Sequence, residues 1–199
     1  MNIVLNDIGK KYTNEWIFKS VNVQFNFSES YAITGHNGSG KSTLLQIILG
    51  STLPTKGKVT LPFPKNDMHE YVSFVAPYQQ LPLELTLQEL LNIHTLCKPI
   101  IMGNDDFLEE IHLKDKKDKL LHFFSSGMIQ RLKLGLAIYA KAPILLLDEP
   151  IISLDQKNIN WYSSAINKIK EKKLIIISSN DEKEYNFCNE IIDITSFKP

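Results

Sequence analysis

The stretch between residues 35 and 43 constrains this chain more than any other, because it satisfies the pattern G-x-x-x-x-G-K-[ST]. It consists of Gly35, His36, Asn37, Gly38, Ser39, Gly40, Lys41, Ser42 and Thr43. Its glycines allow backbone dihedrals that turn successive N–H groups inward, where they can surround phosphate oxygens. Lys41 adds a mobile positive charge, and the Ser42 hydroxyl is an oxygen ligand of the kind that Mg²⁺ prefers. The pattern therefore predicts a loop that binds phosphate groups together with Mg²⁺.

Apolar runs flank this loop on both sides. Residues 31–34 are typical of a short buried strand, and residues 43–49 are typical of a helix that ends at Gly50. A helix that begins at the loop adds the positive end of its dipole to the phosphate site. A glycine-rich turn alone is more often a tight connection, but the Lys41–Ser42 pair favours phosphate binding.

The composition limits the classes of protein to which the chain can belong. Its 199 residues suffice for a sizeable core, so we expect a single domain over residues 1–199. Lys and Arg together number 22, as do Asp and Glu, and this balance argues against nucleic acid as a partner. Cys97 and Cys188 match no zinc-binding spacing, which predicts free thiols in a reducing cytoplasm. We find neither a secretory signal nor a membrane-spanning run.

The order of the apolar patterns predicts an α/β fold. Strands are expected at 3–5, 21–27, 31–34, 58–61, 71–75, 143–147, 174–178 and 191–194. Helices are expected at 86–96, 105–111, 127–140 and 159–172. We therefore expect a mostly parallel sheet with an antiparallel β edge, and a helical lobe inserted at about 77–140. The charged run 114–119 is mixed in sign and predicts a solvated loop.

Aromatic residues occur in a polar segment, 10–16, that we expect to be a turn between the first two strands. Either Tyr12 or Trp16 could stack on a base, because every base has a π-face. Composition alone supports equally well an aromatic ring that covers the edge of the sheet. Both interpretations stay open at this stage.

An acidic pair, Asp148 and Glu149, follows the apolar run 143–147. In open α/β sheets, ligands bind at the carboxyl ends of the strands, which is where these side chains emerge. Asp148 is placed to hold Mg²⁺ opposite Ser42, and Glu149 is placed to deprotonate an attacking water. An acidic pair alone would be a solvated strand end, but the phosphate loop favours the functional interpretation.

A second candidate anion site lies at the start of the helix expected near residue 127. Ser125, Ser126 and Gly127 offer a hydroxyl and bare backbone N–H groups at a helix N-terminus. A single bound phosphate group does not obviously need both this helix N-terminus and the one at the phosphate loop. The surplus indicates that the second end serves a nucleotide held by another copy of the chain.

In order along the chain, these motifs resemble the nucleotide-binding domain of ATP-binding cassette (ABC) transporters. The resemblance covers the segments 35–43, 124–131 and 144–150, and two further short segments. Those two are Ser153-Leu154-Asp155 and Ser178-Ser179-Asn180-Asp181. It implies a P-loop NTPase core, ATP as the nucleotide and Mg²⁺ as the metal.

The resemblance also implies roles for individual residues. Tyr12 would be the adenine-stacking aromatic, Lys41, Ser42 and Thr43 would lie at the phosphates and Mg²⁺, and Asp148 and Glu149 would be metal ligand and base. Ser125 and Gly127 would reach the γ-phosphate bound by a partner copy, with Asp155 across the dimer interface. The inserted helical lobe would touch a transmembrane subunit.

Three positions depart from the family pattern. Ser126 replaces a glycine of the signature Leu-Ser-Gly-Gly-Gln, and Asn180 replaces a histidine. The glutamine expected near Pro77 is out of register, with Gln79 and Gln80 slightly later; we assign Gln79 to the nucleotide site. Asn180 either contacts the γ-phosphate or caps a helix that begins near Glu182. These departures are expected to affect hydrolysis more than binding.

We therefore expect an ATP-hydrolysing subunit that acts as a head-to-tail homodimer on the inner face of the cell membrane and drives a separate transmembrane partner. One alternative is a soluble ABC-type ATPase in DNA repair or translation, which would call for tandem cassettes, a long coiled-coil insertion or a basic patch. Another is a weakly hydrolysing or non-catalytic module regulated by nucleotide, which the three departures leave open.

Overall fold

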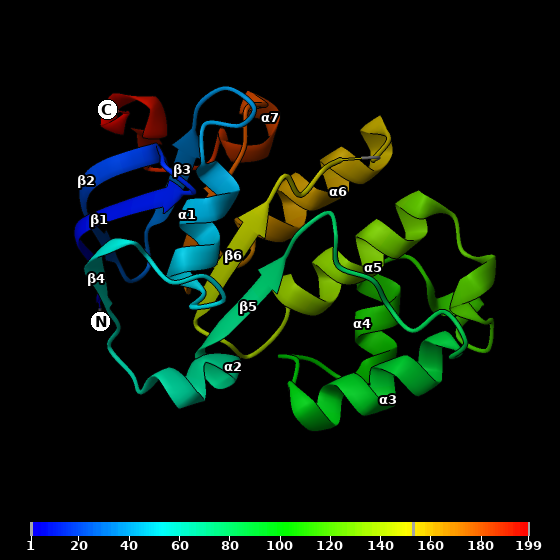
Figure 1. Cartoon of the computed structure of the whole chain (residues 1–199). Helices are drawn as coiled ribbons and strands as arrows, with labels where there is room; N and C mark the ends of the chain where they lie inside the picture. Colours follow the sequence, from blue (N-terminus) through cyan, green and yellow to red (C-terminus); the bar gives the residue numbers. More distant parts are fainter. Residues whose placement is uncertain (1, 153, 199) are drawn as a thin grey trace.

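A five-stranded parallel sheet forms the centre of the protein (Figure 1). The computed structural model describes residues 2–152 and 154–198. The strands of this sheet are β3 (Ser30–Thr34), β5 (Val72–Val75), β6 (Ile144–Asp148), β7 (Leu174–Ser178) and β8 (Glu190–Asp193), in the spatial order β5-β6-β7-β3-β8. All of its neighbouring strands pair in parallel. The predicted α/β fold is confirmed.

Strand β6 shows how the sheet organises the hydrophobic core. Its residues are all buried, as expected of a strand covered on both faces. Leu145 and Leu147 pack into one apolar cluster with the helices, whereas Ile144 and Leu146 pack into a second cluster with β1 (Asn2–Tyr12) and β2 (Glu15–Asn26). Successive side chains of a strand point to opposite faces, so the sheet separates the two clusters.

The antiparallel strands form a sheet of their own, in the order β2-β1-β4. They are β1 (Asn2–Tyr12), β2 (Glu15–Asn26) and β4 (Lys56–Thr60). The turn predicted at 10–16 is wrong in extent, because cross-strand pairing continues to Lys11 with Trp16 and Tyr12 with Glu15. These aromatic residues favour a pleated surface, and their pairing depends on the partner strand rather than on local periodicity.

Helix α1 (Lys41–Ile48) packs its apolar face into the cluster shared with β1 and β2. It begins two residues earlier than predicted, at the lysine of the phosphate loop. The residue after its C-cap, Gly50, has φ +77°, a left-handed conformation that glycine adopts without steric cost. The helix therefore ends just before Gly50, as predicted.

Three helices of the predicted lobe lie together on one side of the molecule, away from the antiparallel sheet (Figure 1). They are α3 (Leu87–Cys97), α4 (Asn104–Glu110) and α5 (Ser126–Ile138). All three are inserted between β5 and β6, which are neighbours in the sheet. The capping box predicted at Thr86 and Glu89 is present at the start of α3. That the whole chain forms one domain stays a prediction.

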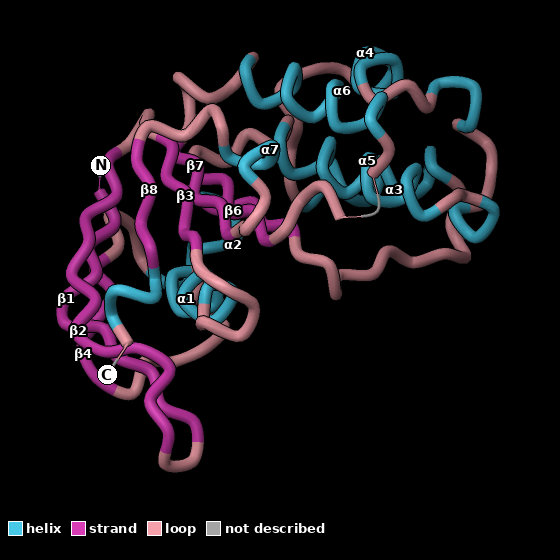
Figure 2. The backbone as a smooth tube through the Cα atoms, turned by 90° about the horizontal axis from the view of Figure 1, so that it is seen from above, coloured by secondary structure: helices cyan, strands magenta, loops and turns pink. Residues whose placement is uncertain are grey.

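The remaining helices are shorter or lie along the sheet, and Figure 2 shows most helices gathered on one side of the strands. They are α2 (Met68–Tyr71), α6 (Gln156–Asn167) and α7 (Glu182–Tyr185), with 3₁₀ turns at Lys65–Asp67, Lys114–Lys116, Leu121–Phe123 and Ile194–Phe197. The bounds predicted for α6, 159–172, are wrong, because Asp155 caps it and accepts a hydrogen bond from the Asn158 N–H at 2.9 Å.

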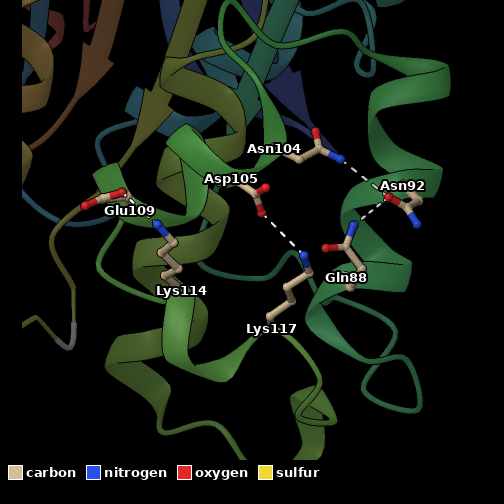
Figure 3. A network of polar contacts seen from close by, with 7 residues as sticks. All are labelled: Gln88, Asn92, Asn104, Asp105, Glu109, Lys114 and Lys117. Atoms are coloured by element: carbon tan, nitrogen blue, oxygen red, sulfur yellow. Dashed lines mark hydrogen bonds and ion pairs between the residues drawn. The ribbon is translucent and has the colours of Figure 1, made fainter.

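The charged run 114–119 forms a surface turn beside α4, as predicted. Lys114 pairs with Glu109 at 3.0 Å and Lys117 with Asp105 at 3.4 Å, while Asn104 contacts Asn92 of α3 (Figure 3). Exposed pairs of this kind contribute at most about 1 kcal/mol each. The run is therefore a solvated surface segment whose ion pairs add little to the stability of the lobe.

Candidate active site

The carboxyl ends of three adjacent strands, β3, β7 and β6, meet at one edge of the sheet. Asp148 of β6 pairs with Ser178 of β7, and Ile33 of β3 pairs with the same serine from the other side. Beyond the strands, the Glu149 N–H donates to the Ser178 carbonyl at 2.9 Å. The phosphate loop, the acidic pair and the segment after β7 are thereby brought together, as the rule for open α/β sheets requires.

The phosphate loop depends on glycine at specific points. Gly40 has φ +104°, and a Cβ there would lie 2.5 Å from Ile17 Cγ2. Gly38 has φ +78°, but a Cβ there would meet no atom within 4 Å. Gly40 is therefore required for packing against β2, whereas Gly38 is favoured by its left-handed backbone alone.

Polar contacts tie the loop to its surroundings. The buried Lys41 ammonium donates to the carbonyls of Gly35 at 2.8 Å and His36 at 3.3 Å. His36 Nε2 lies 2.8 Å from the Lys198 ammonium, so Nε2 is the acceptor and Nδ1 donates to the Asn37 carbonyl. Thr43 lies half-buried in the first turn of α1. Lys41 is thus held within reach of any anion that the loop binds.

The Ser42 hydroxyl and the Asp148 carboxylate face one another. Ser42 Oγ donates to Asp148 Oδ1 at 2.9 Å, although the two residues are far apart in the sequence. Burial raises the pKa of Asp148, while the hydrogen bond from Ser42 and the charge of Lys41 oppose the rise. Two hard oxygen atoms this close fit Mg²⁺, which keeps several waters and phosphate oxygens as its other ligands. Over residues 2–152 and 154–198, no cluster of three or more His, Cys, Asp or Glu side chains forms a competing metal site.

Glu149 lies at the rim of a cavity of about 400 Å³. Its φ of +44° is unusual for a residue with a side chain and stores backbone strain. Asn37 of the phosphate loop and Asn180, beyond β7, line the same cavity. Three segments distant in the sequence therefore place a carboxylate and two amides around one space.

Asn180 contacts the phosphate loop and does not cap the following helix. Its Nδ2 donates to Asn37 Oδ1 at 2.7 Å. The cap of α7 is Asp181, whose Oδ1 accepts from the Lys183 N–H at 3.0 Å. The capping alternative for Asn180 is therefore wrong, because the neighbouring aspartate occupies that position.

The residues assigned to the second anion site lie elsewhere. Ser125 is exposed and caps α5, where its Oγ accepts from the Met128 N–H at 3.2 Å. Gly127 follows in the first turn of that helix, and Asp155 is exposed at the start of α6. Among the described residues, no hydrogen bond joins any of them to the phosphate loop. Ser153, which belongs to the same predicted motif as Asp155, lies outside the described residues.

Gln79 makes its hydrogen bonds within its own segment and with helix α5. Its Oε1 accepts from the Ala76 N–H at 3.0 Å, and its backbone carbonyl accepts from the Lys133 ammonium at 3.2 Å. The side chain lines a cavity of about 780 Å³ between the segment after β5 and helix α5. Its assignment to the nucleotide site stays a prediction.

Both aromatic candidates lie near the tip of the β1–β2 hairpin. The Tyr12 ring is 48% exposed, with the Lys10 ammonium 4.8 Å from its centroid. Trp16 is less exposed and lies between Lys11 and Lys19, whose ammonium groups are 5.9 Å and 5.0 Å from the ring. Tyr12 is therefore the more exposed of the two aromatic residues.

A glutamate that the sequence does not distinguish also lines the cavity of Glu149. Glu184 is only 3% exposed, and its Oε1 accepts from the Ile151 N–H at 2.9 Å. Burial raises the pKa of Glu184 to about 7, helped by the charges of Asp181 and Glu149. It stands in a polar run with no periodicity, so no sequence signal identifies it as buried.

Comparisons with known proteins show the family to which this chain belongs. The family model described as ABC transporter matches residues 18–152. An uncharacterized ABC transporter ATP-binding protein, YybJ of Bacillus subtilis, is 30% identical over 91% of this chain and 85% of its own length. The cytochrome c biogenesis ATP-binding export protein CcmA of Haemophilus influenzae is 25% identical, covering 92% of this chain and 90% of its own. The bacitracin transport ATP-binding protein BcrA of Enterococcus faecalis is 29% identical over 94% of this chain and 64% of its own.

Solved structures show the same fold. The ATP-binding subunit of an ABC transporter superimposes with a TM-score of 0.83 at 23% identity, covering 98% of this chain and 87% of that one. A bacterial ABC transporter cassette solved as a dimer, MJ0796, superimposes with a TM-score of 0.81 at 24% identity, covering 96% and 93%. Within the described part of the chain, no helix is both long and apolar enough to span a membrane.

Proposed function

Because this chain belongs to the ABC transporter family, among its ATP-binding members, we propose that it binds ATP at the phosphate loop and hydrolyses it. The observation that carries the proposal is the juxtaposition of the Ser42–Asp148 pair with the cavity lined by Asn37, Glu149 and Asn180. A phosphate-binding loop, a pair of metal-ligating oxygens and a carboxylate at an open space are the parts that phosphoryl transfer to water needs.

Each group has a definite task. The loop amides and Lys41 bind the β- and γ-phosphates, and Ser42 and Asp148 would hold Mg²⁺. When bound, Mg²⁺ supplies positive charge that offsets the charge of the phosphates. Glu149 orients a water and accepts its proton, and the Asn180 amide donates to the γ-phosphate oxygens.

The same proposal includes a second copy of the chain. Ser125 and Gly127 stand at an accessible helix N-terminus, and within residues 2–152 and 154–198 no hydrogen bond ties them to the phosphate loop. In a head-to-tail homodimer, this helix end of each copy meets the nucleotide bound by the other copy. The two nucleotide sites then lie in one symmetric interface, and the assembly is complete with two copies. Closure of that dimer would drive a transmembrane partner in the cytoplasmic membrane. Tyr12, stacked on adenine, completes the site.

ATP-dependent dimerisation of Glu149→Gln tests this proposal. The variant keeps the binding groups but lacks the base, so ATP should convert it from monomer to dimer on size-exclusion chromatography with light scattering. Lys41→Ala is the matched control, because it removes the phosphate contact and should stay monomeric in ATP. A Glu149→Gln protein that binds ATP yet remains monomeric would contradict the dimeric arrangement.

A further inference from the structure

A single peptide group, the one that joins Pro150 to Ile151, is held by side chains from two different helices. On its carbonyl side, Gln130 Nε2 of α5 donates to the Pro150 oxygen at 2.7 Å. On its amide side, the Ile151 N–H donates to Glu184 Oε1 of α7 at 2.9 Å. Gln130 is 5% exposed and Glu184 is 3% exposed. Because a peptide group is planar and rigid, the two contacts together fix its orientation.

This peptide group lies one residue beyond the base of the proposed reaction. Glu149 precedes Pro150, whose ring restricts its own φ, so the orientation of the held peptide is transmitted to the Glu149 backbone. Glu149 also has φ +44°. A conformation of this kind costs about 1–3 kcal/mol and persists only where the surroundings over-determine it. The contacts of Gln130 and Glu184, with the Glu149 N–H bond to Ser178, supply that constraint.

The contacts use buried polar groups, which are costly to retain. Among the described residues, Glu184 Oε2 is buried and has no hydrogen-bond partner, a cost of about 1–3 kcal/mol. An apolar side chain of the same size would avoid that cost but would leave the Ile151 N–H without an acceptor. The carboxyl group also lines the cavity that Glu149 and Asn180 share.

We propose that Gln130 and Glu184 are positioning residues that together direct the Glu149 carboxylate toward the nucleotide. This inference rests on the proposed role of Glu149 as the base. Gln130 lies on α5, the helix whose N-terminus carries Ser125. The contact therefore also links the surface assigned to a second copy with the alignment of the base.

Kinetics of three variants and one control test this inference. Gln130→Met and Glu184→Met remove one contact each at nearly constant volume, whereas Glu184→Gln keeps an oxygen acceptor for the Ile151 N–H. The control is Ser73→Ala, which removes a buried side-chain bond to the Ile144 carbonyl, 3.2 Å long, at the other end of β6. We expect kcat to fall about 10- to 100-fold in both methionine variants with KM for ATP nearly unchanged, because small misplacements cost this much. Glu184→Gln and the control should stay near wild type.

The double variant sharpens the test. Both residues hold one peptide group, so the combined loss in kcat should be close to the larger single loss and not to their product. If one methionine variant does not fold, the other still carries the test, since each releases one side of the peptide.

Hydrogen exchange of the Ile151 amide tests the same contact in the absence of nucleotide. The Ile151 N–H should exchange faster in Glu184→Met than in Glu184→Gln or the control. Turnover that survives Glu149→Gln would contradict the proposed function and this inference together. Turnover that needs Glu149 but is unaffected by both methionine changes would contradict the inference alone, as would multiplicative losses or unchanged Ile151 exchange.

Discussion

The protonation of Glu184 should make the stability of the protein fall as the pH rises through neutrality. Burial raises the pKa of this carboxyl from 4.5 to about 7 in the folded protein. The folded state therefore keeps a proton that the unfolded state releases, and folding is favoured most at low pH. The stabilisation is fully present below the unfolded pKa of 4.5 and is lost as the pH rises through about 7.

The size of the effect follows from the shift. A pKa difference of about 2.5 units, at about 1.36 kcal/mol per unit, corresponds to about 3 kcal/mol in total. Between about pH 5.5 and about pH 8, the two-state linkage relation assigns about 2 kcal/mol of this loss. Solvent screens the interactions of the Glu184 carboxyl little, because the residue is only 3% exposed.

Urea unfolding of the wild type and Glu184→Gln across this pH range measures the effect. The variant cannot ionise at this position, so its free energy of unfolding relative to the wild type should grow by about 2 kcal/mol as the pH rises. Contributions from all other groups are common to both proteins and cancel in the difference. Parallel pH profiles for the two proteins would refute a buried, proton-retaining Glu184.

Three further outcomes are expected. Lys41→Ala should lose most of its ATP affinity in isothermal titration calorimetry, because the ammonium held at the phosphate loop is removed. Binding as tight as that of the wild type would contradict this. Tyr12→Ala should weaken ATP binding by about 1–3 kcal/mol but leave inorganic triphosphate binding unchanged, since only ATP has a base to stack; equal losses would point away from Tyr12. Asn180→His should raise turnover while ATP affinity changes little, because a charged donor bonds about twice as strongly as a neutral amide; unchanged steady-state turnover would argue against a contact with the γ-phosphate.

Features that depend on short local patterns could be predicted from the sequence. The phosphate loop, the capping box at Thr86 and the apolar run before Asp148 each specify their own conformation within a few residues. The proximity of Ser42 and Asp148 followed from one general rule, that parallel strands present their carboxyl ends at the same edge. No tertiary information beyond that rule was needed.

Features that depend on a distant partner could not be predicted. The β1–β2 hairpin extends through Tyr12 because β2 pairs with it, and α6 begins at Gln156 because Asp155 caps it ahead of the first apolar residue. Glu184 and Gln130 give no signal, since a polar residue on a short or amphipathic helix is normally solvated. Only the fold shows that both are buried and hold the same peptide.

The central claim is that this chain hydrolyses ATP with Glu149 as the base. Steady-state release of phosphate from Mg²⁺·ATP, measured side by side for the wild type and Glu149→Gln at equal ATP occupancy, tests it most directly. General base catalysis contributes about 10²–10⁴-fold, so the variant should release phosphate at least about a hundredfold more slowly while binding ATP as tightly. Equal rates of phosphate release from the two proteins, or no release from either, would contradict the claim.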